Sequence, residues 1–152
     1  MLRVFLLLIT VIGLLSVSHV LPAAEPTASD DLQGKPHAKR IIALSPHGVE
    51  MLFAIGAGDS IVATTDYADF PAAAKNIPSI GGYYGIQIER VIELNPDLVL
   101  VWQSGNKIED INQLRDLGFT VVNSDPKSLA DVATDIELLG KLTGHSVKAK
   151  QV

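Results

Sequence analysis

From Arg40 onward, short apolar runs alternate with segments in which apolar residues recur at helical spacing. The clearest run is Asp97 to Trp102, DLVLVW, which directly follows Asn95-Pro96. A continuous apolar run of this length is typical of a strand in a parallel sheet whose two faces are covered by helices. Proline disfavours helical backbone at the preceding residue, so the helix before this run is predicted to end there. The alternation at βαβ spacing predicts an α/β fold, Rossmann-like, with a mostly parallel sheet flanked by helices.

The same alternation predicts the other elements. Strands are predicted at residues 40–44, 60–65, 97–102 and 119–122, and residues 75–85, with Pro and Gly but no period, are predicted to be loop. Neither GxGxxG nor GxxxxGK[ST] follows a predicted strand, which argues against nucleotide binding. Four helical stripes lie between or after the strands: Val49, Leu52 and Phe53; Ile88, Val91 and Ile92; Ile108, Ile111, Leu114 and Leu117; Leu129, Val132, Ala133, Ile136 and Leu139.

Residues 1–24 have the layout of a secretory signal peptide. Arg3 supplies a positive start, Val4–Leu15 is almost entirely apolar, and small residues follow as far as Ala24. The apolar run is short for a membrane span, so we expect cleavage and release into a bacterial periplasm. An uncleaved N-terminal anchor is the alternative. The chain has no cysteine and therefore no disulfide framework and no thiol to carry a lipid.

The rest of the chain divides into three predicted parts. Residues 25–39 are polar, with scattered Pro, Ser, Asp and Gly, and predict a flexible linker. Residues 40–145 are long enough to form one domain with a hydrophobic core. Residues 146–152 look like the first turn of another helix, so we do not expect the natural chain to end there. A net charge of −5 without a basic run argues against nucleic acid as a partner.

Aromatic residues gather where this fold is expected to bind a ligand. In an open parallel sheet, ligands bind beyond the carboxyl ends of the strands. Those ends lead into Ser45-Pro46-His47-Gly48, Asp66-Tyr67, Trp102 and Asn123-Ser124-Asp125, and a loop carrying Tyr83-Tyr84 joins two of the strands. Aromatic residues are only 5% of the chain, yet its three tyrosines and one tryptophan fall near this rim. The pattern predicts a flat apolar ligand held by stacking and phenol groups. The alternative is that Trp102 closes the end of the sheet and the tyrosines cover loops.

We find no catalytic set and no metal site in the sequence. His47 would need further ligands nearby, but the other histidines are predicted to lie in the leader, in the linker and after the last full helix. Ser45 is not in a GxSxG elbow. Its hydroxyl and the amides of the next helix start are instead predicted to hold a polar group of the ligand. Asp66 and Asp69 occupy turn positions, where Asp commonly bonds its own backbone.

Glu89 is an acidic residue in the first turn of a predicted helix, where the helix dipole favours a negative charge. The helix dipole alone is a sufficient reason for an acidic residue at this position. A second interpretation is that Glu89 is an exposed carboxylate that meets an arginine on a partner protein.

Three segments together resemble a known family, the periplasmic cobalamin-binding proteins of ABC importers. They are RIIALSP at 40–46 with Glu50, YADFP at 67–71, and IERVIELNPDLVLVW at 88–102. Much of the third segment is shared with siderophore and haem binders of the same class III substrate-binding family. Tyr67 before Asp-Phe-Pro and Trp102 before Gln-Ser-Gly-Asn favour cobalamin. The resemblance runs from about Arg40 to the end of the chain.

The resemblance implies half of a two-lobed protein, in which one long helix joins the lobes and the corrinoid is gripped between them. It implies that Tyr67 and Trp102 line the pocket, that the Ser45–Gly48 loop faces the ligand, and that Tyr83 replaces a common tryptophan. Glu89 matches the glutamate that docks on permease arginines. The implied protein is a monomeric, non-enzymatic carrier whose partners are an inner-membrane permease and its ATPase.

Three alternatives remain open at this point. The first is an iron-siderophore or haem binder of the same class. The second is an exported hydrolase using Ser45 or Asp66. The third is a non-functional fragment, because the second lobe implied by the resemblance is missing. We expect this chain to be the N-terminal lobe, with residues 146–152 starting the interlobe helix.

Overall fold

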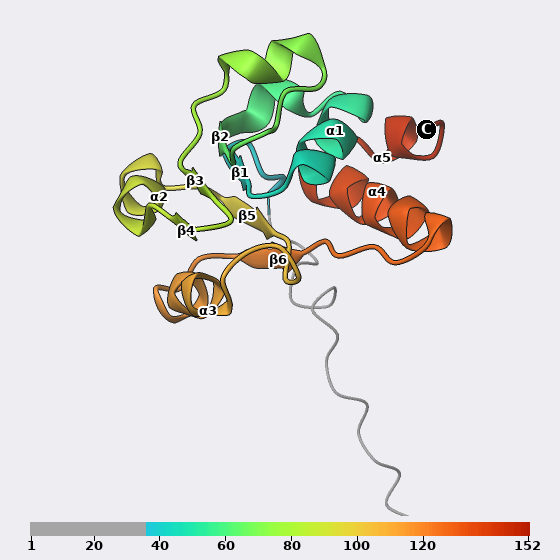
Figure 1. Ribbon diagram of the computed structural model, residues 1–152. Helices are drawn as coiled ribbons and strands as arrows, with labels where there is room; N and C mark the ends of the chain where they lie inside the picture. Colours follow the sequence, from blue (N-terminus) through green and yellow to red (C-terminus); the bar gives the residue numbers. More distant parts are fainter. Residues whose placement is uncertain (1–35) are drawn as a thin grey trace, which may run out of the picture.

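The computed structural model describes residues 36–152. The predicted signal peptide and most of the predicted linker lie outside these residues. The fold is built on a four-stranded sheet in which every pairing is parallel (Figure 1). Its order is β2-β1-β5-β6, with strands β1 (Ile41–Ala43), β2 (Ile61–Thr64), β5 (Leu98–Val101) and β6 (Val121–Asn123). The predicted α/β architecture is confirmed.

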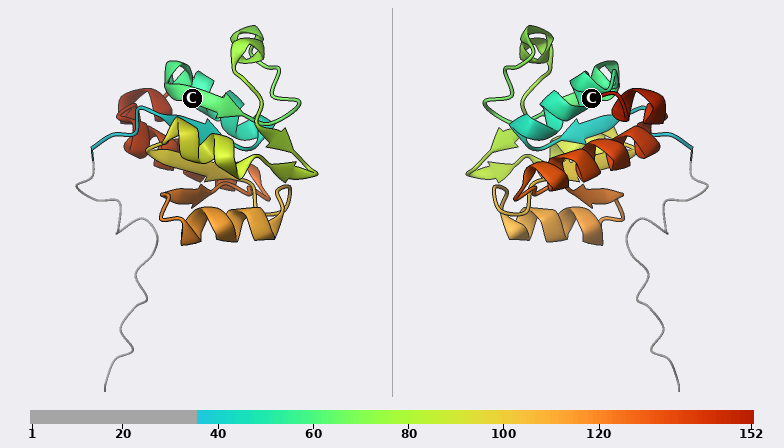
Figure 2. Two further views of the ribbon diagram at one scale, coloured as in Figure 1. Left: turned by 90° about the vertical axis from the view of Figure 1, so that its left-hand side faces the viewer. Right: turned by 90° about the vertical axis from the view of Figure 1, so that its right-hand side faces the viewer.

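Helices cover both faces of this sheet, as the two side views in Figure 2 show. One face packs on α1 (Pro46–Ala54) and α4 (Leu129–Thr143), and the other packs on α2 (Ile88–Leu94) and α3 (Ile108–Asp116). The remaining elements are two 3₁₀ turns, η1 (Gly58–Ser60) and η2 (Ala72–Asn76), the antiparallel hairpin β3 (Gly81–Gly82) and β4 (Gly85–Ile86), and α5 (Ser146–Ala149).

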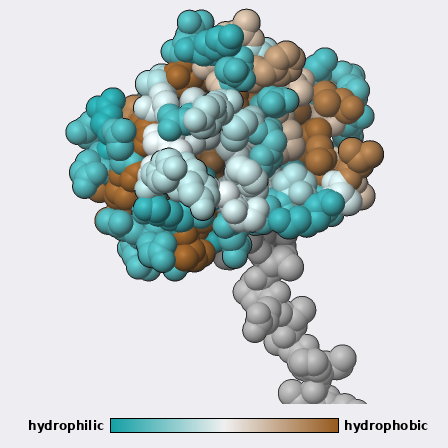
Figure 3. Space-filling view, in the orientation of Figure 1, coloured by the Kyte–Doolittle hydropathy of each residue, from teal (hydrophilic) through white to brown (hydrophobic). Residues whose placement is uncertain are grey.

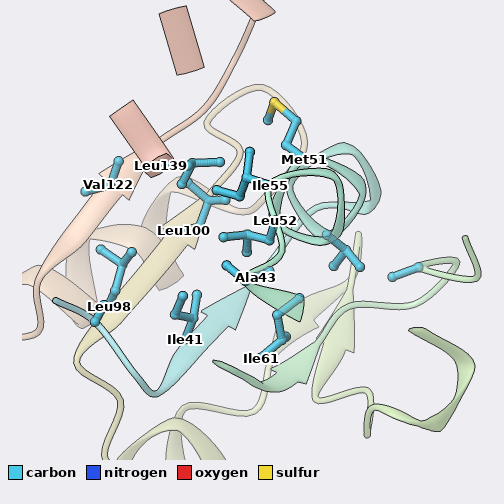
Figure 4. Packing of buried hydrophobic residues seen from close by; sticks show 14 of the residues in the cluster. Ile41, Ala43, Met51, Leu52, Ile55, Ile61, Leu98, Leu100, Val122 and Leu139 are labelled. Atoms are coloured by element: carbon cyan, nitrogen blue, oxygen red, sulfur yellow. The ribbon is translucent and has the colours of Figure 1, made fainter. Parts of the chain in front are cut away.

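Successive side chains of each strand point to opposite faces of the sheet, so they pack into two separate hydrophobic clusters. Ile41 and Leu100 pack with α1 and α4, whereas Ile42 and Val99 pack with α2 and α3. Figure 4 shows the first of these clusters, with Leu100 beneath side chains of α1 and α4. Full burial of each such side chain stabilises the fold by about 1.5–3 kcal/mol. The two central strands, β1 and β5, are therefore apolar and buried along their whole length.

The structure shifts several predicted boundaries. Helix α1 begins at Pro46 rather than near Gly48, because Ser45 caps it and proline is tolerated in the first turn. Strand β6 begins at Val121, two residues late. Residues 75–85 are not simply loop, since they contain the end of η2, strand β3 and the turn of the hairpin.

The end of the predicted linker is part of the lobe. The backbone N–H of Ala38 donates to the carbonyl oxygen of Leu142 at 2.9 Å. The N–H groups of Lys39 and Arg40 donate to the carboxylate of Asp97 at 2.9 and 3.0 Å. The last residues of the predicted linker, Ala38 and Lys39, are thus hydrogen-bonded to the lobe.

Four large side chains of the predicted stripes are exposed instead of buried, as is the small side chain of Ala133. On α2 the buried line runs through Ile88 and Val91, which leaves Ile92 on the flank and 50% exposed. The other three are Ile108, Leu117 and Leu129, which stand at or beside the ends of α3 and α4. The predicted helical turn after residue 145 is present as α5, which packs on α4.

Candidate functional site

The sheet has a switch point between its two central strands. Strand β1 pairs with β5 in the register Ile42↔Val99. From β1 the chain crosses through α1 to β2 on one side, and from β5 it crosses through α3 to β6 on the other. The loops that follow β1 and β5 therefore diverge and leave a crevice, which is where ligands bind in open α/β sheets. The carboxyl ends of the strands face the viewer in Figure 1.

The loop after β1 is tightly fixed. The hydroxyl of Ser45 accepts a hydrogen bond from the N–H of Gly48 at 3.1 Å, and Ser45 is 0% exposed. A Cβ at Gly48 would lie 2.7 Å from that hydroxyl oxygen, so the close approach requires glycine. The hydroxyl that was predicted to hold a polar group of the ligand is therefore buried and engaged in capping α1. The same burial removes Ser45 as a nucleophile. Pro46, next in the chain, is only partly buried.

His47 joins the ends of three strands. Its ring meets that of Trp102 edge-on, with centroids 5.4 Å apart and planes at 89°. Its Nε2 lies 3.2 Å from the carbonyl oxygen of Ser124 and 3.4 Å from the hydroxyl of Ser45. Within residues 36–152, no group of three His, Cys, Asp or Glu side chains could hold a metal ion. In this structure His47 packs edge-on against the Trp102 ring.

Trp102 stands immediately after β5 and is partly buried. Its indole Nε1 donates to Oδ1 of Asp125 at 3.0 Å. Its backbone N–H donates to Oδ1 of Asn106 at 2.8 Å, and the Asn106 amide donates in turn to the carbonyl oxygen of Leu44 at 2.9 Å. A Cβ at Gly105 would overlap the indole ring, so the ring lies directly against this glycine. The backbone, ring nitrogen and one side of the tryptophan are all fixed at the switch point.

Asp125 is a functional candidate to which the sequence assigned no role. Its Oδ1 accepts hydrogen bonds from Trp102 Nε1, from the Ser104 hydroxyl at 2.7 Å and from Lys127 Nζ at 2.8 Å. The Lys127 ammonium and the Ser104 hydroxyl hold the pKa of the Asp125 carboxyl below its usual range. The carboxylate is therefore ionised at neutral pH and suited to orient the indole. The feature of the sequence that could have identified Asp125 is its position just after strand β6.

The loop after β2 carries Tyr67 at φ 66°, the left-handed region, and leaves its side chain 90% exposed. Asp66 accepts a hydrogen bond from the Ser79 hydroxyl at 2.6 Å, and its N–H donates to the carbonyl oxygen of Gly81 at 2.8 Å. An open pocket of about 450 Å³ lies beside Tyr67, between residues 64–69 and 74–79. Phe70 in this loop is also exposed and was missed as a candidate, although it belongs to the YADFP segment.

Tyr83 and Tyr84 form the turn of the β3–β4 hairpin. Their rings meet edge-on with centroids 5.5 Å apart, and both are highly exposed. The hairpin is held by Asp110 of α3, whose Oδ2 accepts a hydrogen bond from the Ile86 N–H at 2.9 Å. Gly81 has φ 147° and a Cβ there would overlap the backbone of Gly85, so glycine is required.

Four of the predicted site residues thus form two groups in which aromatic rings are in contact. One consists of His47 and Trp102, and the other is the Tyr83–Tyr84 pair, which the Asp66–Gly81 hydrogen bond ties to the Tyr67 loop. From this end of the sheet, the middle of the surface has intermediate hydropathy (Figure 3). Such a surface suits a ligand that combines apolar area with polar groups.

Glu89 is the second residue of α2 and is exposed, as predicted. Glu93, one turn later, forms an ion pair with Arg90. Glu89 has no ion-pair partner among the described residues, so its carboxylate is available for an external cation. No helix among residues 36–152 has the length and apolar character to cross a membrane.

A parallel α/β lobe with an aromatic rim at its switch point has the form of a solute-binding lobe. Residues 41–152 match the family model described as periplasmic binding protein, and the chain belongs to that family. It is a family of binding proteins rather than of enzymes, and the predicted family resemblance is confirmed.

Individual relatives refine this assignment. The chain is 38% identical over 114 residues to the vitamin B12-binding protein of Yersinia pestis (strain Pestoides F), which covers 75% of this chain and 41% of the relative. The crystal structure of the periplasmic vitamin B12 binding protein BtuF of Vibrio cholerae superposes with a TM-score of 0.73 at 36% identity, over 75% of this chain and 45% of that one. The chain therefore spans less than half the length of these relatives.

Proteins named as binders of other solutes share the fold. A possible iron-binding protein from Staphylococcus epidermidis has a TM-score of 0.67 at 28% identity, over 76% of this chain and 46% of that one. A periplasmic heme binding protein from Pseudomonas aeruginosa has a TM-score of 0.70 at 22% identity, over 75% of this chain and 41% of that one. The architecture is thus common to proteins named as binders of several solutes.

Proposed function

We propose that this chain is the substrate-binding component of an ABC importer, that it binds cobalamin in the periplasm, and that it delivers the ligand to an inner-membrane permease. The observation that carries the proposal is the fixed Trp102 at the switch point, accompanied by the exposed Tyr67 and the Tyr83–Tyr84 pair. Vitamin B12-binding relatives at 36–38% identity support the choice of ligand.

A corrinoid fits the chemistry of this rim. It is a broad, flat macrocycle with apolar edges and amide side groups, which suits aromatic faces and phenol hydroxyls. Ligands with carboxylate or catecholate groups call for free cations. Lys127, the cation next to the Trp102 network, is already bonded to Asp125. Two other exposed cations lie near the rim, Lys107 in the loop after Trp102 and Lys75 in the wall of the pocket beside Tyr67. The choice of cobalamin over haem or a ferric siderophore therefore rests on the aromatic rim and on the vitamin B12-binding relatives.

We propose that the described lobe supplies one wall of the binding site. Small-ligand sites usually bury most of the ligand surface, and a single wall buries a smaller share. The chain spans 41% of the Yersinia relative's length, which supports this view. On the same grounds we propose that α5 begins the interlobe helix. Titration of cobalamin, haem and a ferric siderophore against the chain tests the ligand assignment.

We further propose that residues 1–24 direct export and are cleaved. The test is the intact mass of the protein recovered from the periplasmic fraction of an expressing bacterium. A mature chain beginning at Glu25 is the expected result. A protein that keeps Met1 and sediments with membranes would instead establish an N-terminal anchor.

Docking to the permease is proposed to use Glu89. The residue is exposed in the first turn of α2, on a short helix whose buried side faces the sheet. A carboxylate in this position can accept a bidentate hydrogen bond from arginine. The neighbouring Glu93 is neutralised by Arg90, so Glu89 is the carboxylate of α2 without an ion-pair partner in the described lobe.

A further inference from the structure

Asp125 and Trp102 are 23 residues apart in the chain but adjacent in space, because β5 and β6 are neighbouring strands in the register Val101↔Asn123. The loops that follow the strands are tied together by two more hydrogen bonds. The N–H of Ser124 donates to the carbonyl oxygen of Val101 at 2.9 Å, and the N–H of Gln103 donates to the Asn123 side chain at 2.9 Å. The strand pairing and these loop hydrogen bonds hold the Asp125 carboxylate next to the indole.

The Trp102 ring makes two packing contacts and one hydrogen bond within the described lobe. His47 meets the ring through an edge contact, and Gly105 lies against it without a directional bond. The hydrogen bond to Asp125 at 3.0 Å is the directional contact of the ring within the described lobe. A hydrogen bond to an ionised acceptor is roughly twice as strong as a neutral one. It therefore selects one orientation of the indole about its side-chain torsions.

We propose that Asp125 is a positioning residue, which holds the Trp102 indole in the orientation that receives the ligand. This inference rests on the proposed function and extends it to a residue that does not itself need to touch the ligand. Lys127 and Ser104 serve the same end, since both donate to the same carboxylate oxygen and keep it charged and oriented. A preorganised tryptophan binds more tightly, because less side-chain freedom is lost when the ligand arrives.

A purely structural role for Asp125 would be to begin α4, but the helix has its own capping groups. The hydroxyl of Ser128 accepts a hydrogen bond from the Asp131 N–H at 3.2 Å, and the Asp131 carboxylate accepts one from the Lys127 N–H at 2.9 Å. Asp131 is thus the acid that organises the helix start, while Asp125 is the acid that faces the indole. The two residues provide a matched pair for experiment.

The test compares Asp125→Ala, Asp125→Asn and the control Asp131→Ala in the full chain, first without ligand. Trp102 is the single tryptophan, so fluorescence anisotropy and the near-ultraviolet dichroism of the indole report its mobility directly. We expect Asp125→Ala to lower the anisotropy and flatten the dichroism, and Asp125→Asn, which keeps an oxygen acceptor, to recover most of both. Asp131→Ala should reduce thermal stability and leave both indole signals at the wild-type value.

Cyanocobalamin titration of the same proteins completes the test. The apparent Kd is expected to rise about tenfold in Asp125→Ala, because a freed indole must be ordered when the ligand binds, and to stay within about twofold in Asp131→Ala. Wild-type indole signals in Asp125→Ala would overturn the positioning role. Altered indole signals together with no cyanocobalamin binding by the wild-type chain would instead refute the proposed function and leave the tryptophan restraint standing.

Discussion

Asn106 bonds to Leu44 across the two central strands, with its side-chain Nδ2 donating to the Leu44 carbonyl oxygen at 2.9 Å. Its Oδ1 accepts from the Trp102 N–H at 2.8 Å. One amide therefore satisfies a backbone acceptor at the end of β1 and a backbone donor at the end of β5. This side chain bridges the two loops at the switch point and fixes the backbone of Trp102.

Asn106→Ala is expected to lower the free energy of unfolding by about 2 kcal/mol, because it leaves a backbone donor and acceptor without their partners. Chemical denaturation monitored by circular dichroism measures the change. Asn112→Ala on the exposed side of α3 is the control and should stay within about 0.5 kcal/mol of the wild type. An equal effect of the two substitutions would show that the Asn106 bridge contributes little.

Gly105→Ala is expected to displace the Trp102 ring, because the added Cβ would overlap it. We expect a loss of about 1–3 kcal/mol from overpacking and a shift in the emission maximum of the tryptophan. Gln103→Ala, an exposed substitution on the same loop, should change neither quantity. Unaltered emission in Gly105→Ala would mean that the ring is not held against this glycine.

The stability of the fold should depend on the ionisation of Asp125. Hydrogen bonds from Lys127 and Ser104 lower its pKa in the folded state, so its stabilising contribution is present above the unfolded pKa of about 3.9. That contribution is lost as the pH falls through the lower folded pKa. The difference in unfolding free energy between the wild type and Asp125→Asn should be constant at neutral pH and shrink in acid. A difference that grows in acid would contradict this assignment.

Glu89→Ala is expected to weaken coupling to the permease and leave cobalamin affinity intact. Loss of a carboxylate–arginine contact should reduce stimulation of ATP hydrolysis by a permease–ATPase complex in proteoliposomes roughly tenfold. Glu137→Ala, an exposed acid on α4, is the matched control and should behave as the wild type. A parallel fall in cobalamin affinity would assign Glu89 to the ligand site instead of to docking.

The sequence predicts the sheet well, because the two central strands are continuous apolar runs that are buried on both faces and the edge strands are mostly apolar. The run Leu98–Val101 identifies β5 without ambiguity. The β3–β4 hairpin was missed because its two-residue strands are mostly glycine and carry no period. Its conformation depends instead on positive φ at Gly81 and Gly85. A period-based prediction has nothing to detect in such a segment.

The sequence indicates which loops lie at the site, but it indicates less well which side chains are in contact there. Strand placement puts Trp102 at the carboxyl edge of the sheet, and the structure agrees. Ser45 followed by Pro46 has the pattern of a helix N-cap with proline in the first turn, and the structure places the Ser45 hydroxyl in that capping bond. The pairing of Trp102 with Asp125 depends on strand order and register, which spacing along the chain does not determine.

The most direct test of cobalamin binding at this rim is a titration of the chain with cyanocobalamin, hemin and a ferric siderophore. Trp102 emission is corrected for ligand absorption with free tryptophan, and equilibrium dialysis provides an independent measure. Tyr67→Ala is paired with Leu129→Ala, since the two side chains are 90% and 89% exposed but lie on different elements. We predict saturable binding of cyanocobalamin, weakened about fivefold to tenfold by Tyr67→Ala and unchanged by Leu129→Ala. Saturable binding of hemin or the siderophore without binding of cyanocobalamin would contradict the account.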